Sequence, residues 1–212
     1  MICGVDEAGK GSVLGPLVVA AVAVPSETSL DDLGVRDSKL LSPKERERLY
    51  GLIRKRCRVT AIRLDAADID AVRAEMTLNV AVARTHAQAI NTFSPARAYV
   101  DACDVNCFRY AEMVKVHLVH PCEIVSEHHA DAKFAVVSAA SIVAKVTRDR
   151  AIATLAKKYG EMGSGYPSDP VTIRFLNDWI DEHKVPPPIA RRSWKTVSNL
   201  LAKKTQKSLM DF

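Results

Sequence analysis

Apolar residues in the N-terminal part of the chain fall into short runs rich in β-branched side chains, as expected for buried strands. We predict strands at residues 2–6, 17–24, 58–64 and 98–101, and a fifth strand at either 116–119 or 122–125. The turn between the first two strands contains Gly9 and Gly11, so we expect a hairpin there. The first and fourth predicted strands both end in an aspartate, Asp6 and Asp101.

Apolar residues that recur every three or four positions predict helices between and after these strands. The predicted helices cover residues 43–56, 76–90, 136–158, 171–181 and 194–203. Ser42 and Pro43 are typical of a helix start, and Ser94-Pro95 is typical of a helix end. The order of elements predicts an α/β fold with a mixed sheet of five strands flanked by helices.

The length of 212 residues fits one domain with an appendage, or two small domains. A loop-rich stretch follows Gly160, and three consecutive prolines precede the last predicted helix. We therefore divide the chain into a core at residues 1–158, a C-terminal helical part at 159–204 and a tail at 205–212.

Composition and charge narrow the class of protein. The chain is 48% hydrophobic and 26% charged, which excludes wholesale disorder and fibrous architectures. The net charge is +5, but residues 184–207 contain seven basic side chains and no acidic one, which leaves 23 basic against 25 acidic residues elsewhere. This basic end suggests a polyanionic partner, and a solvated helix face is the alternative.

The sequence offers no sign of membrane insertion or export. The longest apolar run, residues 13–24, is too short to span a bilayer, and acidic rather than basic residues precede it. The five cysteines are scattered, form no CxxC pair and are expected to be reduced and structural. We therefore expect a cytoplasmic protein that acts as a monomer and does not bind a membrane.

Four acidic residues are candidates for chemistry: Asp6, Glu7, Asp101 and Asp131. The first three end predicted strands, and the fourth precedes the long apolar helix. Carboxylates gathered at one sheet edge repel one another unless a divalent cation holds them, and Mg²⁺ and Mn²⁺ prefer such oxygen ligands. The alternative is four unrelated surface acids. Each acid ends or flanks a different apolar segment, which favours the metal site.

A phosphate-binding loop must also be considered, because residues 4–11 match the pattern GxxxxGK[ST] except at the last position. Gly11 stands where a hydroxyl would bind Mg²⁺, and a β-rich run follows where a helix should begin. Asp6 and Glu7 within the loop would also repel phosphates. We therefore reject a nucleotide triphosphatase.

Five motifs together resemble ribonuclease HII, and the archaeal branch is the closer match. In chain order they are Asp6-Glu7-Ala8-Gly9-Lys10-Gly11, Asp37-Ser38-Lys39-Leu40-Leu41, Asp101, Ala130-Asp131-Ala132-Lys133 with the following Val137-Ser138-Ala139-Ala140-Ser141-Ile142, and Gly165-Tyr166-Pro167. The archaeal likeness comes from Arg192-Ser193-Trp194-Lys195-Thr196. The resemblance covers nearly the whole chain in the right order.

The resemblance implies an RNase H-like fold whose C-terminal helical part completes the substrate cleft. It also implies an endoribonuclease that hydrolyses the RNA strand of RNA–DNA hybrids and incises 5′ of single ribonucleotides in duplex DNA, leaving 5′-phosphate and 3′-OH ends. Asp6, Glu7, Asp101 and Asp131 would be the catalytic, metal-binding carboxylates. The cofactor would be Mg²⁺ or Mn²⁺, with two ions in the active complex.

The resemblance also implies substrate contacts. The turn Gly9, Lys10 and Gly11 would sense the ribose 2′-OH, Lys39 would hold a phosphate, and Tyr166 would stack on the sugar of the following deoxynucleotide. The middle position of the glycine motif is commonly arginine in the family, and it is Lys10 here. A bidentate phosphate contact by that side chain would be lost, and we expect activity to survive.

The last residues resemble the peptide by which replication and repair enzymes dock on the sliding clamp. Gln206, Leu209 and Phe212 are spaced three apart, which aligns them on a 3₁₀ turn. The usual second aromatic is missing because the chain ends. The alternative is a frayed basic tail, and we favour docking.

Some polar residues stay outside the predicted catalytic set. Ser138, Ser141 and Lys145 lie on one helical stripe, and ordinary caps and salt links explain them equally well.

The alternative function is a non-catalytic, basic module that binds RNA–DNA hybrids. A chelator would abolish turnover by the enzyme but leave hybrid binding by such a module intact.

Overall fold

The computed structural model describes residues 1–35 and 41–210, without the side chains of Asp31 and residues 204–210. The chain forms two compact units. The first contains Met1–Ala8, Val18–Arg63 and Met76–Thr147, and the second contains Gly9–Leu17, Leu64–Glu75 and Arg148–Phe212. Both units are discontinuous in the chain, unlike the consecutive segments proposed from the sequence.

The first unit is built on a five-stranded sheet with the strand order β3-β2-β1-β4-β5. The strands are β1 (Ile2–Ala8), β2 (Leu17–Val24), β3 (Arg58–Leu64), β4 (Arg97–Asp101) and β5 (Glu123–Glu127). Strand β1 pairs antiparallel with β2 and parallel with β4, and β4 pairs parallel with β5. The predicted mixed sheet is therefore confirmed.

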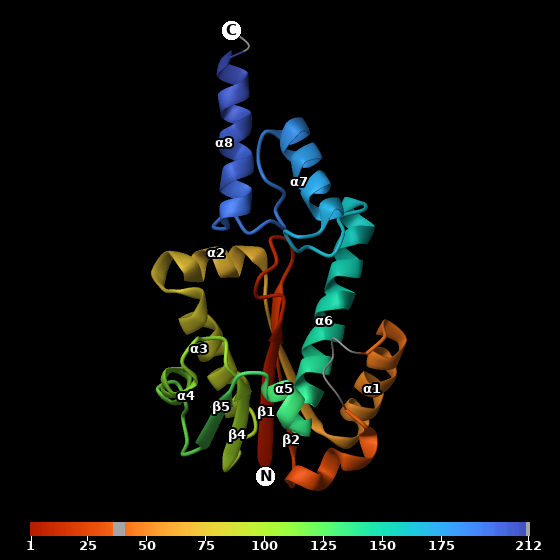
Figure 1. The fold of residues 1–212 in the computed structure, drawn as a ribbon, viewed down its shortest axis with the longest axis vertical. Coiled ribbons are helices and arrows are strands. Elements are labelled where there is room, and N and C mark those ends of the chain that lie inside the picture. Colours follow the sequence, from red (N-terminus) through yellow and green to blue (C-terminus); the bar gives the residue numbers. More distant parts are fainter. Residues whose placement is uncertain (36–40, 211–212) are drawn as a thin grey trace. The chain divides into compact units, whose positions relative to one another are not determined.

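Helices cover both faces of this sheet (Figure 1). They are the 3₁₀ helix η1 (Glu27–Leu33), α1 (Pro43–Arg56), α3 (Leu78–Asn91), α4 (Cys107–Lys115), α5 (Ala130–Lys133) and α6 (Ala135–Tyr159), whose residues after Thr147 belong to the second unit. The predicted start of α1 is confirmed, because Ser42 Oγ accepts a hydrogen bond from the Glu45 N–H. Helices α1 and α6 pack on one face, and α3 and α4 on the other.

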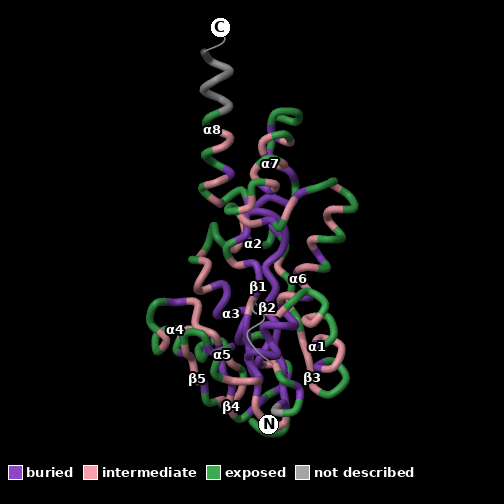
Figure 2. The backbone as a smooth tube through the Cα atoms, turned by 45° about the vertical axis from the view of Figure 1, so that its right-hand side comes forward, coloured by how far each residue is buried: buried purple, intermediate pink, exposed green. Residues whose placement is uncertain are grey.

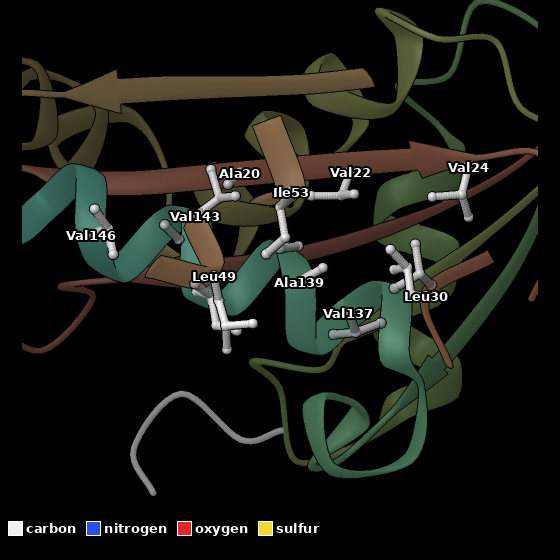
Figure 3. Close-up of a cluster of buried hydrophobic side chains, with 14 of the residues drawn as sticks. Ala20, Val22, Val24, Leu30, Leu49, Ile53, Val137, Ala139, Val143 and Val146 are labelled. Carbon is white, nitrogen blue, oxygen red and sulfur yellow. The ribbon is translucent and has the colours of Figure 1, made fainter. Parts of the chain in front are cut away.

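Strand β2 is buried on both faces, as its unbroken apolar sequence predicts (Figure 2). Its side chains alternate: Ala20 and Val22 join the core with α1 and α6, and Val19 and Ala21 join the core with α3 and α4. Figure 3 shows the first of these cores. Each large apolar side chain buried there stabilises the fold by about 1.5–3 kcal/mol.

A glycine in β1 lets α6 approach the sheet closely. A Cβ at Gly4 would lie 2.3 Å from the backbone carbon and oxygen of Val136, at the start of α6. Any side chain at this position would push the helix away from the strand. Gly4 therefore fixes how closely the first turn of α6 lies over β1.

The second unit contains residues 9–17, α2 (Ala66–Glu75), the last part of α6, α7 (Pro170–His183) and α8 (Lys195–Met210). Its own core is formed by Val13, Leu14, Met162, Leu176, Ile189, Ala190 and Val197. A short antiparallel bridge joins Leu14 to Ala190. Among the described helices, none is both long enough and apolar enough to cross a membrane.

Three strand and helix predictions need correction. Strand β1 continues to Ala8 instead of ending at residue 6, because its pairing with β2 extends to Val18. Helix α3 begins at Leu78 after an N-cap by Thr77, so Met76 precedes it. The fifth strand is Glu123–Glu127, so the prediction at 116–119 is wrong and the alternative near 122–125 is confirmed with a shift.

Helices α2 and α8 differ from the sequence prediction by more than a shifted end. Helix α2 was not predicted, because its apolar side is made mostly of alanine and buries only Ala66 and Ile69. Helix α8 runs to Met210, so residues 205–210 continue the helix and do not form a tail with a 3₁₀ turn. Lysine, glutamine, leucine and methionine all favour helix, and no proline or glycine interrupts them.

Candidate active site at the sheet edge

Two of the predicted carboxylates lie on neighbouring parallel strands. Val5 of β1 pairs with Val100 of β4, so Asp6 and Asp101 follow at the same level of the sheet. Because both strands run in the same direction, their carboxyl ends meet at one edge. The sheet topology thus places both acids at a common edge, as predicted.

Asp131 is held near this edge because the backbone of α5 is bonded to the end of β4. The Ala130 N–H donates a hydrogen bond of 2.8 Å to Asp101 Oδ1, which fixes the first turn of α5 at the end of β4. His129, just before it, adopts a left-handed conformation (φ 55°) that starts the helix. Asp131 follows directly and is buried, with 4% of its surface exposed.

The charge of Asp6 is unfavourable in its surroundings. Burial raises the pKa of Asp6 well above its ordinary value, and the neighbouring charges of Glu7 and Asp101 raise it further. A hydrogen bond from Ser141 on α6 and one from the Glu7 N–H (2.7 Å) oppose the shift. Ser141, which we left outside the predicted set, therefore belongs to the site.

Adjacent residues of a strand point to opposite faces, and β1 remains a strand through both of its acids. Asp6 points to the face covered by α6, where Ser141 lies, and Glu7 points to the face covered by α3. Among the described residues, no group of three or more acidic, histidine or cysteine side chains is arranged to hold a metal ion. Of the four carboxylates expected to gather at one edge, Glu7 therefore faces away from Asp6.

The residues at this edge nevertheless suit a divalent cation by their chemistry. They supply carboxylate oxygens, which are the preferred ligands of Mg²⁺ and Mn²⁺. Burial and the neighbouring charges of Glu7 and Asp101 together raise the pKa of Asp6, and a bound cation would relieve the repulsion among these charges. Asp6, Asp101 and Asp131 are the acids that the strand ends and α5 bring toward one edge.

Glu7 has a buried partner that sequence reasoning missed. Its Oε2 lies 3.1 Å from His86 Nε2 on α3, and His86 Nδ1 lies 3.1 Å from the Tyr110 hydroxyl on α4. His86 and Tyr110 are both fully buried. No sequence pattern indicates this chain of contacts, because 79 residues separate Glu7 from His86.

The predicted ribose-sensing turn, Gly9–Gly11, lies in the second unit and is fixed by a buried arginine. The Arg191 guanidinium donates to the carbonyl oxygens of Gly9 (2.7 Å), Lys10 (2.9 Å) and Gly15 (3.2 Å). Gly9 has a positive φ of 86°, and a Cβ there would lie 2.3 Å from Arg148 Nε. Both features require glycine at this position.

The predicted sugar-stacking tyrosine lies in a loop tied to the same turn. The Gly165 carbonyl, next to Tyr166, accepts hydrogen bonds from the Val13 and Leu14 N–H groups at 2.8 and 3.1 Å. The Arg148 guanidinium lies 4.6 Å from the centre of the Tyr166 ring and donates to the Ser164 carbonyl. The second unit thus brings the glycine turn and the tyrosine loop together.

The basic C-terminal region is not uniformly a phosphate-binding surface. Arg191, counted among its seven basic residues, is fully buried and binds backbone carbonyls, so it is not available to a polyanion. Burial and the nearby Arg148 guanidinium both lower the pKa of Arg191. Lys184, Arg192, Lys195 and Lys203 are exposed. Arg191 therefore fits neither the expected polyanion-binding surface nor the alternative of a solvated helix face.

Some predicted residues lie outside what the structure describes. Lys39 falls in residues 36–40, and Phe212 follows the last described residue. For Gln206 and Leu209 the backbone is described, as part of α8, but the side chains are not. Their predicted roles remain predictions.

Comparison with known proteins decides the family. The model of the family described as Ribonuclease HII matches residues 3–197. Ribonuclease HII of Methanoregula boonei is 69% identical over 212 residues, which is the whole of both chains. The chain belongs to the ribonuclease HII family. It is therefore a ribonuclease H that acts on RNA–DNA hybrids, and this excludes the non-catalytic binding module as its main function.

Solved structures of archaeal ribonucleases agree with this assignment. The crystal structure of ribonuclease H2 from Pyrococcus horikoshii has a TM-score of 0.90 and 39% identity, covering 97% of this chain and 99% of that one. The structure of the PCNA:RNase HII complex from Archaeoglobus fulgidus has a TM-score of 0.88 and 44% identity, covering 94% and 96%. The predicted RNase H-like fold is confirmed. Enzymes of this family generally depend on divalent metal ions.

Proposed function

We propose that this ribonuclease HII incises duplex DNA on the 5′ side of a single ribonucleotide, as well as long hybrids, and leaves 5′-phosphate and 3′-OH ends. Asp6, Glu7, Asp101 and Asp131 would hold two divalent cations for this reaction. The observation that carries the metal site is the crowding of carboxylates at one sheet edge, where Asp6 and Asp101 end neighbouring parallel strands. Burial raises the pKa of Asp6, and the charges of Glu7 and Asp101 raise it further. Such crowding is unfavourable unless positive charge is bound.

Each carboxylate has a distinct part in this proposal. Asp6 and Asp101, adjacent on parallel strands, would share the charge of the bound cations, and the Ala130 N–H would keep the Asp101 side chain oriented. Ser141 would orient Asp6 through its hydrogen bond. Two bound cations supply an activated water and stabilise the leaving oxygen in phosphodiester hydrolysis. Four ionised carboxylates carry as much negative charge as two divalent cations carry positive charge.

The glycine turn would supply the preference for a ribonucleotide. Arg191 holds the carbonyls of Gly9 and Lys10, which fixes the path of the turn before substrate binds. A Cβ built at Gly11 meets nothing within 4 Å, so the space beside it is open to a sugar. The 2′-OH is the group that distinguishes ribose from deoxyribose. Tyr166 would stack on the next sugar, and Lys39 would bind a phosphate.

Product analysis on a long RNA–DNA hybrid tests the metal part of this proposal. With Mg²⁺ or Mn²⁺ we expect fragments carrying 5′-phosphate and 3′-OH ends, and with a chelator we expect hybrid binding without cleavage. Cleavage that persists after exhaustive chelation would contradict a metal-dependent hydrolysis. Products with a 2′,3′-cyclic phosphate would contradict attack by water, because they require attack by the 2′-OH.

We also propose that the C-terminal residues dock on a sliding clamp. Gln206, Leu209 and Phe212 carry the resemblance, and a relative at 44% identity from A. fulgidus has been solved in complex with PCNA. Calorimetric titration of the full chain into the clamp should give micromolar affinity. Phe212→Ala should weaken it more than about tenfold, roughly the 1.4 kcal/mol expected of a buried aromatic anchor. Ser208→Ala is the matched control, and equal affinities for Phe212→Ala and wild type would contradict docking by this tail.

A further inference from the structure

A chain of three polar side chains runs through the apolar core between the sheet and helices α3 and α4. Glu7 lies on β1, His86 on α3 and Tyr110 on α4, and each successive pair is 3.1 Å apart. The His86 and Tyr110 rings meet edge to face, with centroids 5.7 Å apart at an angle of 88°. Their surroundings are apolar, and include Val5, Ala83, Ala87 and Val100.

The chemistry of the carboxylate sets the direction of the first hydrogen bond. A carboxylate only accepts, so His86 Nε2 carries the proton that it donates to Glu7 Oε2. The other ring nitrogen, Nδ1, lies 3.1 Å from the Tyr110 hydroxyl, which also forms a hydrogen bond with Cys103. Both nitrogens of the buried His86 ring therefore have a polar partner.

Such an arrangement has a clear physical consequence for Glu7. A buried polar group that loses its hydrogen-bond partner lowers the stability of the folded state by about 1–3 kcal/mol. His86 and Glu7 therefore have little freedom to separate. The contact occupies one of the two carboxylate oxygens of Glu7. The side chain is thereby held in one orientation, on the face of β1 opposite to Asp6.

We propose that His86 and Tyr110 are positioning residues, which lock Glu7 in the orientation that presents its other oxygen, Oε1, to a divalent cation. This rests on the proposed role of Glu7 as a metal ligand. Tyr110 holds the His86 ring through Nδ1, and His86 holds the carboxylate through Nε2. Neither residue touches the substrate or the ion.

The expected cost of breaking this support is a loss of metal affinity. Partners that orient a metal ligand contribute roughly 10- to 100-fold to affinity in well-studied sites. We therefore expect His86→Phe, which keeps the ring and removes both nitrogens, to weaken Mn²⁺ binding by that factor. His86→Gln places an amide N–H near the position of Nε2, so it should restore most of the affinity.

Calorimetric titration of Mn²⁺ into the metal-free full chain measures this effect without substrate. Thr85→Val is the matched control, because it removes another buried polar group of α3, bonded to the Ala81 carbonyl, without touching Glu7. Weaker binding in His86→Phe than in both His86→Gln and Thr85→Val supports the proposal. Wild-type affinity in His86→Phe, or an equal loss in Thr85→Val, overturns it.

A further variant keeps the proposal testable if His86→Phe folds poorly. The double variant His86→Phe/Tyr110→Phe removes the Tyr110 hydroxyl that His86→Phe would leave without its histidine partner, and it should show the same weakened binding as His86→Phe. Wild-type affinity in the double variant overturns the proposal.

Glu7→Gln separates this inference from the proposed function. If Glu7→Gln binds Mn²⁺ like the wild type, Glu7 is not a ligand, and both the proposed role of Glu7 and the positioning by His86 are overturned. If Glu7→Gln loses the metal while His86→Phe retains it, the ligand role stands and only the positioning role is overturned.

Discussion

The carboxylate edge of the first unit and the glycine turn of the second both contain a buried charged side chain. The surroundings make the charge unfavourable at the edge, whereas hydrogen bonds satisfy it at the turn. At the edge, burial and the neighbouring like charges both make the ionised form of Asp6 unfavourable. At the turn, the Arg191 guanidinium is buried with three backbone carbonyls as partners, and its hydrogen bonds fix the loop. A bound cation would relieve the repulsion in the first region, whereas the buried charge of the second already has its partners.

This difference indicates which region needs a cofactor and which only needs to keep its shape. A metal site is assembled when ions arrive, so it tolerates unfavourable charge beforehand. A sugar-sensing turn gains selectivity when its backbone is rigid before binding. Substitutions at the edge should therefore alter chemistry and metal response, whereas substitutions beneath the turn should alter stability and sugar selectivity.

The largest effect is expected at the edge. Asp101→Asn keeps the oxygen that accepts from the Ala130 N–H but removes the charge that would balance the cations. We expect cleavage of an RNA–DNA hybrid to fall by roughly 1000-fold or more, about 4 kcal/mol of transition-state stabilisation. Hybrid affinity should stay within a few-fold of wild type. Near-normal turnover in this variant would remove Asp101 from the metal site.

The next largest effect tests whether the turn depends on its buried charge. Arg191→Ala removes the guanidinium that donates to the carbonyls of Gly9, Lys10 and Gly15. The Gly9 carbonyl keeps Ser12 as a donor, and a buried carbonyl that loses its donor costs about 1–3 kcal/mol of stability. We expect the free energy of unfolding, measured by chemical denaturation, to fall by about 3 kcal/mol or more, and selectivity for a ribonucleotide over DNA to fall with it. Arg192→Ala, the exposed neighbour, should change stability by less than about 0.5 kcal/mol. Equal effects of the two variants would show that Arg191 does not hold the turn.

A third effect tests the repulsion around Asp6 in chelator-treated protein. Because the folded-state pKa of Asp6 is raised, the group favours folding while protonated, and that contribution is lost as pH rises through the raised pKa. Asp6→Asn should therefore increase the thermal midpoint of the metal-free chain at neutral pH by a few degrees, and added Mg²⁺ should narrow the difference. A lower midpoint for Asp6→Asn without metal would mean that the negative charge stabilises this edge.

The smallest effect concerns the exposed basic residues near the C-terminus. Replacing Arg192, Lys195 and Lys203 with serine should leave turnover at saturating substrate unchanged and weaken hybrid binding at moderate salt. Each phosphate contact adds about 0.9 to the slope of log affinity against log salt, so the slope should fall by up to about 3. An unchanged slope would mean that these side chains form only a solvated face.

Much of the sheet could be predicted from the sequence because β2 is a continuous apolar run and β3 alternates between apolar and polar residues. The predicted ranges of β2 and β3 match the structure, and the ends of β1 and β4 placed Asp6 and Asp101 on neighbouring strands. The end of α8 was harder to predict. The apolar periodicity does not continue through residues 203–210, but no proline or glycine stops the helix there. Local propensity therefore decided the course of α8 where periodicity did not.

Parts of the site could not be predicted, because they depend on pairs that are distant in the chain. Arg191 reads as one more surface charge beside Arg192, and only the fold shows that it is buried beneath Gly9. His86 lies on the apolar stripe of its helix, where a histidine is usually a core residue, and its pairing with Glu7 depends on how α3 packs against β1. The alternation of a strand also separates Asp6 from Glu7, although they are adjacent in sequence.

Cleavage of a DNA duplex that carries one ribonucleotide tests the central claim most directly. With Mg²⁺ or Mn²⁺, the account predicts a single incision on the 5′ side of that nucleotide, leaving a 5′-phosphate, and no incision with chelator. A matched duplex with deoxyribose at the same position should remain intact, because the turn at Gly9–Gly11 would have no 2′-OH to bind. Equal cutting of the all-DNA duplex, or cutting that survives chelation, would contradict both the sugar-sensing turn and the metal site.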